Sequence, residues 1–149
     1  MLQEVDSKLQ KLIEAFTGIL YEDDEIFMEN MRRKKNLSEE ELQKYAHWEW
    51  TQGVGLYGIW KLFSASGEKK YLEMLTRYYD RQLQVGFPQC NVNTVTPYLT
   101  LSYLAEYLQS ETYMQPCREA AEWIMYEMPR TMEGGIQHMT SDDVNEQEL

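Results

Sequence analysis

The sequence predicts an all-α protein made of stacked αα-hairpins, and two observations carry this prediction. Apolar residues recur at helical spacing along most of the 149 residues. The pattern of one helix pair also repeats in the next, since a shift of 42 positions carries Tyr71 onto Tyr113. The same shift places apolar residues on apolar ones at the flanking positions: Leu56 on Tyr98, Ile59 on Leu101, Leu62 on Leu104, Leu72 on Met114 and Leu75 on Cys117. Helix pairs that repeat at this length stack into an open solenoid or close into an α/α toroid.

The first 45 residues are predicted to be mostly helical. Residues 2–20 place apolar side chains on one stripe between charged ones, which indicates an amphipathic helix. The charged stretch 21–37 has scattered apolar residues, and we expect it to continue as helix. Ser38 followed by Glu41 forms a capping box, which starts a short helix that runs toward Tyr45.

The next part of the chain is predicted to supply two helix pairs. The first of these helices begins near Thr51 and ends at Gly67, a typical C-terminal stop. Turn residues bound the others, because Gly86 breaks the chain, Pro97 is tolerated in a first turn and Pro129 ends a helix. These three helices span residues 68–84, 96–108 and 112–128.

Composition and charge restrict the domain count and the partners. With 43% hydrophobic and 13% aromatic residues, we expect one ordered domain over residues 1–149. The net charge of −11, from 25 acidic and 14 basic residues, repels a phosphate backbone and an anionic membrane surface. The basic run 32–35 lies between acidic residues at 22–25 and 39–41, and we interpret it as a self-compensated, solvated linker. We therefore expect neither nucleic acid nor a membrane among the partners.

The sequence predicts no metal site and no export signal. Cys90 and Cys117 form no C-x-x-C motif, and we expect both to be reduced, buried thiols. Two histidines without nearby thiols are too few for a zinc site. The N-terminus is acidic, and no apolar run has the length of a signal core or a membrane span, so we expect a cytoplasmic protein.

The run from His47 to Phe63 stands out because it gathers three Trp, three Gly and one His. Within it, Gly53, Gly55 and Gly58 spell G-x-G-x-x-G, the pattern that cradles a dinucleotide in other proteins. No strand precedes it and helices follow, which is the wrong context for that function. We interpret the glycines as small residues that let an inner helix approach its neighbours.

The repeat makes three loops equivalent, at residues 47–52, 89–94 and 132–145. Equivalent loops of a stacked repeat emerge on one face, so their polar residues could converge there. Trp48 and Trp50 alternate, and in an extended segment they point in opposite directions. We favour Trp50 for a cleft, and the alternative is that both rings are packed.

Other polar residues of these loops have two interpretations each. A lone loop histidine such as His47 is more often structural than catalytic. Asn91, Asn93 and Thr94 either cap the following helix or face the cleft. A catalytic acid could be among the carboxylates near the end of the chain, although the last two fit a solvated tail: Glu133, Asp142, Asp143, Glu146 and Glu148.

Three ordered segments resemble the unsaturated rhamnogalacturonyl and glucuronyl hydrolases, glycoside hydrolase families 105 and 88. They are residues 47–58, Asn91-Val92-Asn93-Thr94, and residues 133–140. The resemblance covers the chain from about residue 48 onward, and it implies a six-hairpin (α/α) barrel of which this chain supplies about half. We therefore expect a single toroid domain that is truncated at its C-terminus and self-associates through an open half-barrel edge.

The resemblance also implies an activity. Enzymes of this family remove the unsaturated uronic acid that polysaccharide lyases leave at the non-reducing end of an oligosaccharide, here of the rhamnogalacturonan (pectin) type. An Asp protonates the C4=C5 double bond, water adds at C5, and the resulting hemiketal opens to release the saccharide. No metal or organic cofactor is implied. The alternative is a non-catalytic helical-repeat module that binds a glycan or a protein.

Five residues form the expected substrate-binding set. Trp50 resembles the aromatic residue that contacts the substrate, and His138 resembles the histidine that lines the uronate subsite. Asn93 stands where better-known relatives have a second acidic residue, and an amide can bind a sugar but cannot transfer a proton at neutral pH. The adjacent Gln52 and Thr94 complete the set.

The principal catalytic Asp is expected beyond Leu149. In relatives it lies in a Trp-x-Asp segment that opens the third inner helix, and this chain ends before such a segment. Asp142 and Asp143 come earlier and are the catalytic candidates within the chain. We therefore expect no activity from this chain alone.

Overall fold

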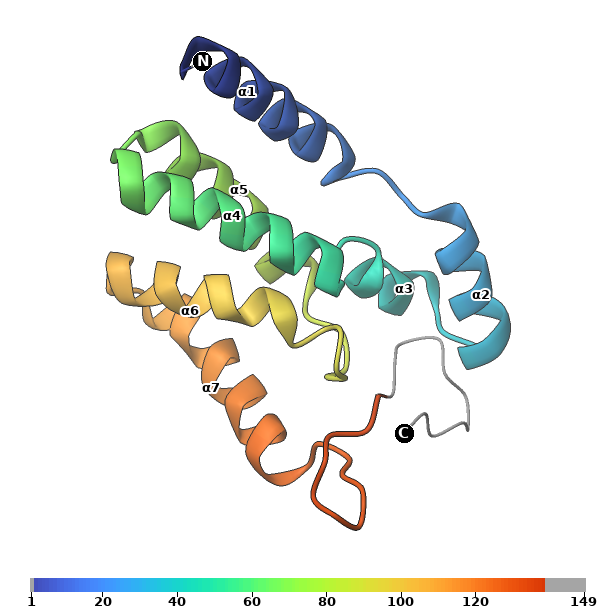
Figure 1. The fold of residues 1–149 in the computed structure, drawn as a ribbon. Coiled ribbons are helices and arrows are strands. Elements are labelled where there is room, and N and C mark those ends of the chain that lie inside the picture. The colour runs from blue at the N-terminus through green and yellow to red at the C-terminus, as the bar shows by residue number, and fades with distance from the viewer. Residues whose placement is uncertain (1, 139–149) are drawn as a thin grey trace.

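The computed structural model describes residues 2–138 and confirms the all-α class (Figure 1). Within this range there are seven helices, and an isolated β bridge pairs Arg130 with Ile136. The helices are α1 (Leu2–Ile19), α2 (Glu25–Lys35), α3 (Glu39–Tyr45), α4 (Trp50–Ser66), α5 (Lys69–Val85), α6 (Thr96–Leu108) and α7 (Glu111–Tyr126). None of these helices is long and apolar enough to cross a membrane.

Several helix ends lie where local sequence signals predict them. The capping box that begins α3 is present: the Ser38 hydroxyl accepts from the Glu41 backbone N–H at 3.2 Å, and the Glu41 carboxylate accepts from the Ser38 backbone N–H at 2.9 Å. α4 ends at Gly67, whose φ of 70° is a left-handed conformation that glycine adopts without strain. The predicted span of residues 96–108 for α6 is confirmed.

The expectation of continuous helix over residues 21–37 is wrong in its first part. Residues 20–24 separate α1 from α2. Asp24 takes an extended conformation, and its carboxylate accepts a hydrogen bond from the Phe27 backbone N–H at 2.9 Å. A carboxylate that satisfies an otherwise unpaired N–H at the start of a helix favours a new helix start at this position.

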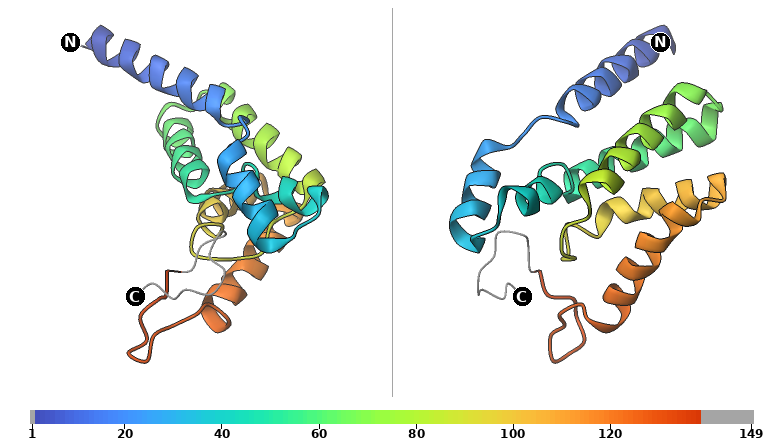
Figure 2. Two further views of the ribbon diagram at one scale, coloured as in Figure 1. Left: turned by 90° about the vertical axis from the view of Figure 1, so that its right-hand side faces the viewer. Right: turned by 180° about the vertical axis from the view of Figure 1, so that it is seen from behind.

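The four central helices form two stacked αα-hairpins, as predicted. α4 with α5 and α6 with α7 run antiparallel, and α4 lies beside α6 while α5 and α7 flank them from the other side (Figures 1 and 2). α1 packs across the first hairpin, since the Thr17 hydroxyl lies 3.8 Å from the Met74 sulfur of α5. The expectation that these hairpins are half of a closed barrel stays a prediction.

Positions that the 42-residue repeat relates are buried alike. Tyr71 of α5 and Tyr113 of α7 are both buried, and so are Ile59 of α4 and Leu101 of α6. The Tyr113 hydroxyl donates to the Asp80 carboxylate at 2.5 Å, which ties α7 to α5. The repeat read from the sequence is therefore a repeat of core positions.

Both cysteines are unpaired. Cys117 is buried, and burial raises the pKa of its thiol to about 12. Cys90 is only partly buried, and burial together with the negative charges of Glu127 and Glu119 raises the pKa of its thiol. Both thiols are therefore protonated at neutral pH.

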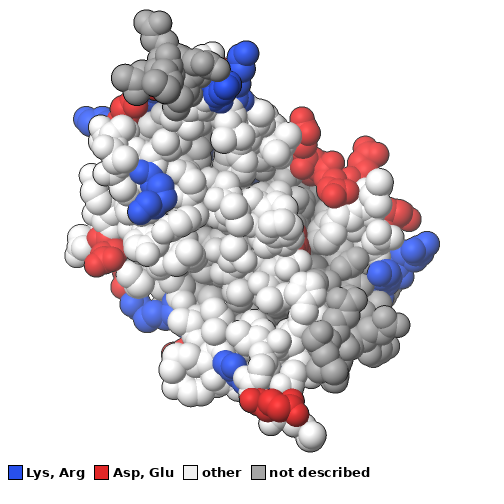
Figure 3. Space-filling view, in the orientation of Figure 1, with Lys and Arg blue, Asp and Glu red and all other residues white. Residues whose placement is uncertain are grey.

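The outward face of α4 and α6 carries few charges. Figure 3 shows this face, whose centre is almost free of Lys, Arg, Asp and Glu. Large apolar side chains of both helices remain exposed: Val54 on α4, and Leu99, Tyr103 and Tyr107 on α6. An exposed apolar surface of this kind favours contact with another protein surface.

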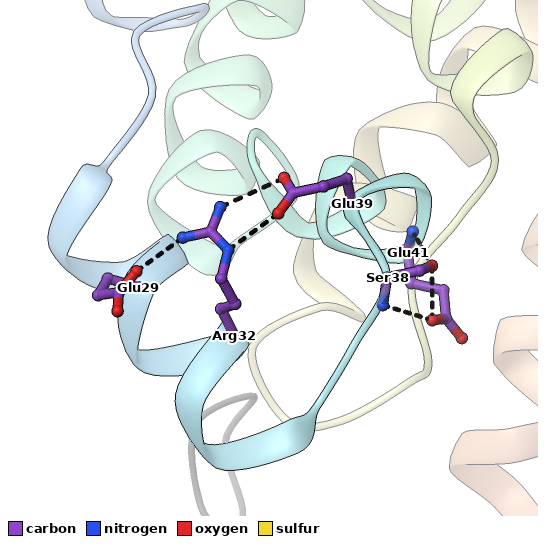
Figure 4. A network of polar contacts seen from close by, with 5 residues as sticks. All are labelled: Glu29, Arg32, Ser38, Glu39 and Glu41. Carbon is purple, nitrogen blue, oxygen red and sulfur yellow. Dashed lines mark hydrogen bonds and ion pairs between the residues drawn. The ribbon is translucent and has the colours of Figure 1, made fainter.

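α2 and α3 form a smaller unit with its own apolar cluster, which includes Met31 and Leu42. Arg32 links the two helices, because its guanidinium donates to Glu39 at 2.9 Å and to Glu29 at 2.7 Å (Figure 4). The hydrogen bonds from Arg32 hold the pKa of Glu39 below its usual range. The basic run is therefore compensated by acidic neighbours as predicted, but the interpretation as a linker is wrong, because residues 32–35 form the last turn of α2.

Candidate functional site

Three chain segments meet at one end of the hairpin stack. They are residues 47–49 before α4, residues 86–95 before α6 and residues 127–138 after α7 (Figures 1 and 2). Because α4 and α6 run in the same direction, their N-termini share this end, as the repeat predicts. The candidate site is built on these segments.

Trp48 joins the first two segments. Its side chain is fully buried, and its indole N–H donates to the Thr94 carbonyl oxygen at 2.8 Å. Its ring stacks on Tyr78 at 6.1 Å and meets Phe87 and Tyr98 edge-on at 5.0 Å each. The chain before α4 is therefore fixed against the chain before α6 by one hydrogen bond and an aromatic cluster.

The second segment is held by a turn around Asn91. The Asn91 side-chain oxygen accepts from the backbone N–H groups of Asn93 at 2.8 Å and Thr94 at 3.1 Å. The Thr94 hydroxyl accepts from the Asn91 backbone N–H at 2.8 Å and donates to the Gln89 carbonyl oxygen at 2.9 Å. Such side-chain bonds to a nearby backbone stabilise tight turns.

A close backbone approach brings the N-termini of α4 and α6 together. A Cβ atom on Gly53 would lie 2.7 Å from Thr96 Cγ2 and 2.9 Å from the Pro97 nitrogen, so no larger residue fits without movement. At Gly55 a Cβ atom would overlap the Phe16 ring of α1. The interpretation of the glycines as packing residues is confirmed at these two positions, whereas Gly58 faces open space.

Trp48 and Trp50 differ in exposure, as their alternation predicts, and a cleft at Trp50 stays a prediction. Trp50 is the first residue of α4 and is 51% exposed, while Trp48 is fully buried. Beside it, the Gln52 side-chain oxygen accepts from the Glu49 backbone N–H at 3.2 Å and from the Thr51 hydroxyl at 3.0 Å. Gln52 is thus oriented by the first turn of α4, with its amide nitrogen as the remaining donor group.

Asn93 and Thr94 are adjacent but differ in access. Asn93 is partly exposed at the turn before α6, whereas Thr94 is fully buried and its hydroxyl is used within the turn. Thr94 therefore does not cap α6, whose N-cap residue is Val95 without a side-chain cap bond, and its hydroxyl is not free to face a cleft. The hydrogen bond from Trp48 to Thr94 holds the start of α4, with Trp50 and Gln52, beside the turn that contains Asn93.

The third segment forms a tight hairpin after α7. The Thr131 backbone N–H donates to the Gly135 carbonyl oxygen at 2.8 Å, and the Gln137 N–H donates to the Pro129 carbonyl oxygen at 3.0 Å. This hairpin leads to His138, which is exposed. The catalytic candidates Asp142 and Asp143 lie outside the described residues.

His47 is a structural residue. Its side chain is buried, its Nε2 lies 3.3 Å from the Asp23 carboxylate, and its backbone carbonyl oxygen accepts from the Tyr78 hydroxyl. Burial lowers the pKa of the imidazole, Arg81 lowers it further, and Asp23 opposes them. A neutral imidazole at neutral pH fits its place in the core.

The exposed side chains of the candidate site are of the kinds that bind sugars. An exposed indole face suits the apolar face of a sugar ring, and side-chain amides donate to and accept from hydroxyl groups. Across residues 2–138 there is no group of three or more His, Cys, Asp or Glu side chains that could hold a metal ion. In the described part, the site therefore offers recognition groups and no metal centre.

Sequence reasoning missed the contacts by which Trp48 and Asn91 organise the site. The Trp48 indole N–H donates to a residue 46 positions away in the sequence, and no local sequence pattern predicts such a hydrogen bond. Asn91 was one of three polar residues that could cap α6, but it acts inside the loop and on the backbone of Asn93. Its signal was the Asn-x-Asn-Thr spacing, which is typical of side-chain-stabilised turns.

Comparisons with known proteins identify the family of the chain. The family model of Glycosyl Hydrolase Family 88 matches residues 23–149. The Unsaturated rhamnogalacturonyl hydrolase YesR of Bacillus subtilis (strain 168) is 32% identical over 91 residues, which are 61% of this chain and 26% of that protein.

Two solved structures have the same fold over nearly the whole chain. Each is described as "a possible member of GH105 family". The one from Klebsiella pneumoniae is 35% identical with a TM-score of 0.71, and the match covers 93% of this chain and 36% of that one. The one from Salmonella enterica is 33% identical with a TM-score of 0.73 and covers 93% and 37%. This chain thus spans about a quarter to just over a third of the length of these relatives, and it belongs to Glycosyl Hydrolase Family 88.

Proposed function

We propose that this chain is the substrate-binding N-terminal part of a glycoside hydrolase that acts on unsaturated uronides. The substrate would be the rhamnogalacturonan-type oligosaccharide that a polysaccharide lyase leaves with an unsaturated uronic acid at its non-reducing end. Family membership supports the class of enzyme, and the name of the Bacillus subtilis relative supports the substrate. The single observation that carries the proposal is the exposed Trp50 ring at the shared end of α4 and α6.

The proposed reaction is a hydration. A carboxylic acid delivers a proton to C4 of the C4=C5 double bond, and the oxygen of water bonds to C5. The product is a hemiketal, which opens and releases the saccharide, while the carboxylate recovers its proton from the attacking water. This route needs a positioned acid, a water molecule and a bound sugar.

The residues of this chain would bind and orient the sugar. The Trp50 ring would cover its apolar face, while the amides of Gln52 and Asn93 would bind its hydroxyl groups. His138 would face the uronate carboxylate, where a protonated or donating imidazole is favourable. Thr94 would act indirectly: its buried hydroxyl holds the Asn91 backbone, and the Asn91 side chain holds the backbone of Asn93.

The proton donor would be an Asp. Asp142 and Asp143 are the candidates in this chain, in the segment that follows His138. Replacing each by Asn removes the transferable proton while preserving shape, so an Asn variant of the true donor should bind substrate and fail to turn it over.

The test is to follow the ultraviolet absorbance of an unsaturated rhamnogalacturonan disaccharide with the purified protein, together with calorimetric titration of the same sugar. Binding with loss of absorbance supports the hydrolase. Binding without turnover by this chain fits both a glycan-binding module and a hydrolase whose catalytic Asp lies beyond Leu149. Loss of absorbance with a longer protein that contains this chain distinguishes the two, because only the hydrolase turns the sugar over. Neither binding nor turnover would contradict the proposal, and the saturated disaccharide is the matched control.

A further inference from the structure

A cavity of about 540 Å³ lies between the turn that follows α5 and the C-terminal half of α7. None of its lining residues belongs to the set proposed for sugar binding. Three aromatic side chains, two carboxylates and one thiol give it its character: Phe87, Tyr98, Trp123, Glu119, Glu127 and Cys90. The proposed function therefore leaves this cavity unexplained.

The aromatic wall of the cavity is preorganised. The Phe87 and Tyr98 rings lie 5.5 Å apart, and both are fixed by edge-on contact with the buried Trp48 ring at 5.0 Å. Trp123 lines the cavity from α7. Aromatic faces carry a negative quadrupole and attract cations as well as apolar groups.

The charge of the cavity has one sign. Glu119 and Trp123 lie one turn apart on α7 and Glu127 is its C-cap residue, and all three line the cavity. The two glutamates are roughly 12 Å apart along the helix axis. The described lining residues include no Lys, Arg or His. The nearby Arg130 guanidinium donates instead to the Ile124 carbonyl oxygen at 3.4 Å.

The surroundings of the two glutamates also favour a bound cation. Glu127 stands at the C-terminus of α7, where the helix dipole is negative. Burial raises the pKa of the Cys90 thiol at the cavity wall, and the negative charges of Glu127 and Glu119 raise it further. Glu119 is oriented by a hydrogen bond from the Gln115 amide at 2.8 Å.

We propose that this cavity binds a linear aliphatic diamine or polyamine. One ammonium group pairs with Glu119 and another with Glu127, and the methylene chain between them lies along Trp123 and Phe87. A metal ion fits poorly, because two carboxylates this far apart cannot share one ion. Phosphates and other anions meet no positive group among the described lining residues.

Spermidine is the probe, since its two terminal ammonium groups are separated by a chain of matching length. Calorimetric titration at low salt should show binding by the 149-residue protein. The double variant Glu119→Gln/Glu127→Gln should bind about tenfold more weakly or worse, because both ion pairs are lost. Glu122→Gln removes a charge from the same helix outside the cavity and is the matched control.

Two comparisons separate this site from general attraction to a protein of net charge −11. n-Butylamine, with one ammonium group, should bind about tenfold more weakly than spermidine. Trp123→Phe should keep binding and Trp123→Leu should weaken it, with circular dichroism reporting the fold of each. No binding of spermidine would overturn the proposal, and so would equal losses in the cavity variant and in Glu122→Gln.

Discussion

Two tryptophans only two positions apart have opposite environments. Trp48 is enclosed by four aromatic rings and bonded to the Thr94 carbonyl oxygen, while Trp50 begins α4 and is half exposed. The first therefore contributes to stability and to the geometry of the site. The second is available to a ligand.

Trp48→Phe should destabilise the protein by about 1–3 kcal/mol, because the Thr94 carbonyl oxygen loses a buried donor. Urea unfolding followed by circular dichroism measures this change. Trp50→Phe is the matched control and should change stability by less than about 0.5 kcal/mol. Equal effects of the two substitutions would show that Trp48 does not organise the fold.

Trp50→Ala should weaken binding of the unsaturated disaccharide about tenfold, since it removes the aromatic face. The free energy of unfolding should stay nearly unchanged because the side chain is exposed. Titration calorimetry measures the affinity, with Val54→Ala as an exposed control on the same helix. Unchanged affinity in Trp50→Ala would contradict the assigned role.

His47 should make stability depend on pH. Burial places its folded-state pKa below the unfolded value of about 6.5, so the unfolded chain takes up the proton first as the pH falls. The contribution of His47 is complete above pH of about 6.5 and is lost as the pH falls through the folded-state pKa.

The measurement is the urea midpoint between pH 7.5 and 5.5, a range chosen to lie on both sides of the ordinary histidine pKa of about 6.5. It should fall more steeply in the natural protein than in His47→Gln. A slope that His47→Gln does not change would contradict the prediction.

At the residue scale, sequence reasoning predicted what depends on local geometry. The alternation of Trp48 and Trp50 predicted one packed ring and one exposed ring, because neighbours in an extended chain point in opposite directions. It could not separate Asn93 from Thr94, since both residue types suit a turn and only the buried hydrogen bonds distinguish them.

At the element scale, α4 shows how one helix can contain both tolerant and intolerant glycines. Gly53 lies against the backbone of α6, whereas a Cβ atom on Gly58 meets nothing within 4 Å. The helix propensity gained by alanine is about 1 kcal/mol at either site. Only the space around each position differs.

Gly53→Ala should therefore destabilise the protein by about 1–3 kcal/mol, because α4 and α6 must move apart. Gly58→Ala should stabilise it by up to about 1 kcal/mol. Thermal and urea unfolding of the two variants provide the comparison. A stabilising Gly53→Ala would show that α4 and α6 do not approach as closely as described.

Helix boundaries could be predicted where a cap or a breaker stands in the sequence. Ser38 with Glu41 and the glycine at position 67 did so, and the end of α6 was predicted as well. The break before α2 was missed because Asp24 is one of several acidic residues in a row, and only the backbone shows which of them caps the helix.

At the scale of the whole molecule, the uncharged face of α4 and α6 has no partner helix in the described structure (Figure 3). Self-association through an open half-barrel edge stays a prediction, and we propose that this face of α4 and α6 takes part in it. Val54 and Leu99 are exposed there, and apolar surfaces gain free energy when they are removed from water.

Analytical ultracentrifugation should show concentration-dependent association of the natural chain. Leu99→Lys should weaken it, because association would bury an unpaired charge. Leu12→Lys changes a leucine on α1 that is even more exposed than Leu99, and it should have no effect. A monomer at all concentrations, or equal effects of the two variants, would rule out this interface.

The stacked αα-hairpins could be predicted because the same pattern of apolar residues occurs in both hairpins. What the repeat did not predict is how tightly the two loops are joined, since the Trp48 contacts combine residues from α5, α6 and two loops. Long-range contacts of this kind depend on the assembled fold and leave no local spacing to read.

The most direct test of the proposed sugar site is a nuclear magnetic resonance titration of the ¹⁵N-labelled chain with the unsaturated rhamnogalacturonan disaccharide. The protein has four tryptophans, so each indole N–H signal can be assigned by substitution. We predict shifts of the Trp50 indole and the Asn93 amide signals, with the buried Trp48 indole nearly unchanged. Shifts confined to other tryptophans, or no shifts at saturating sugar, would contradict the proposed site.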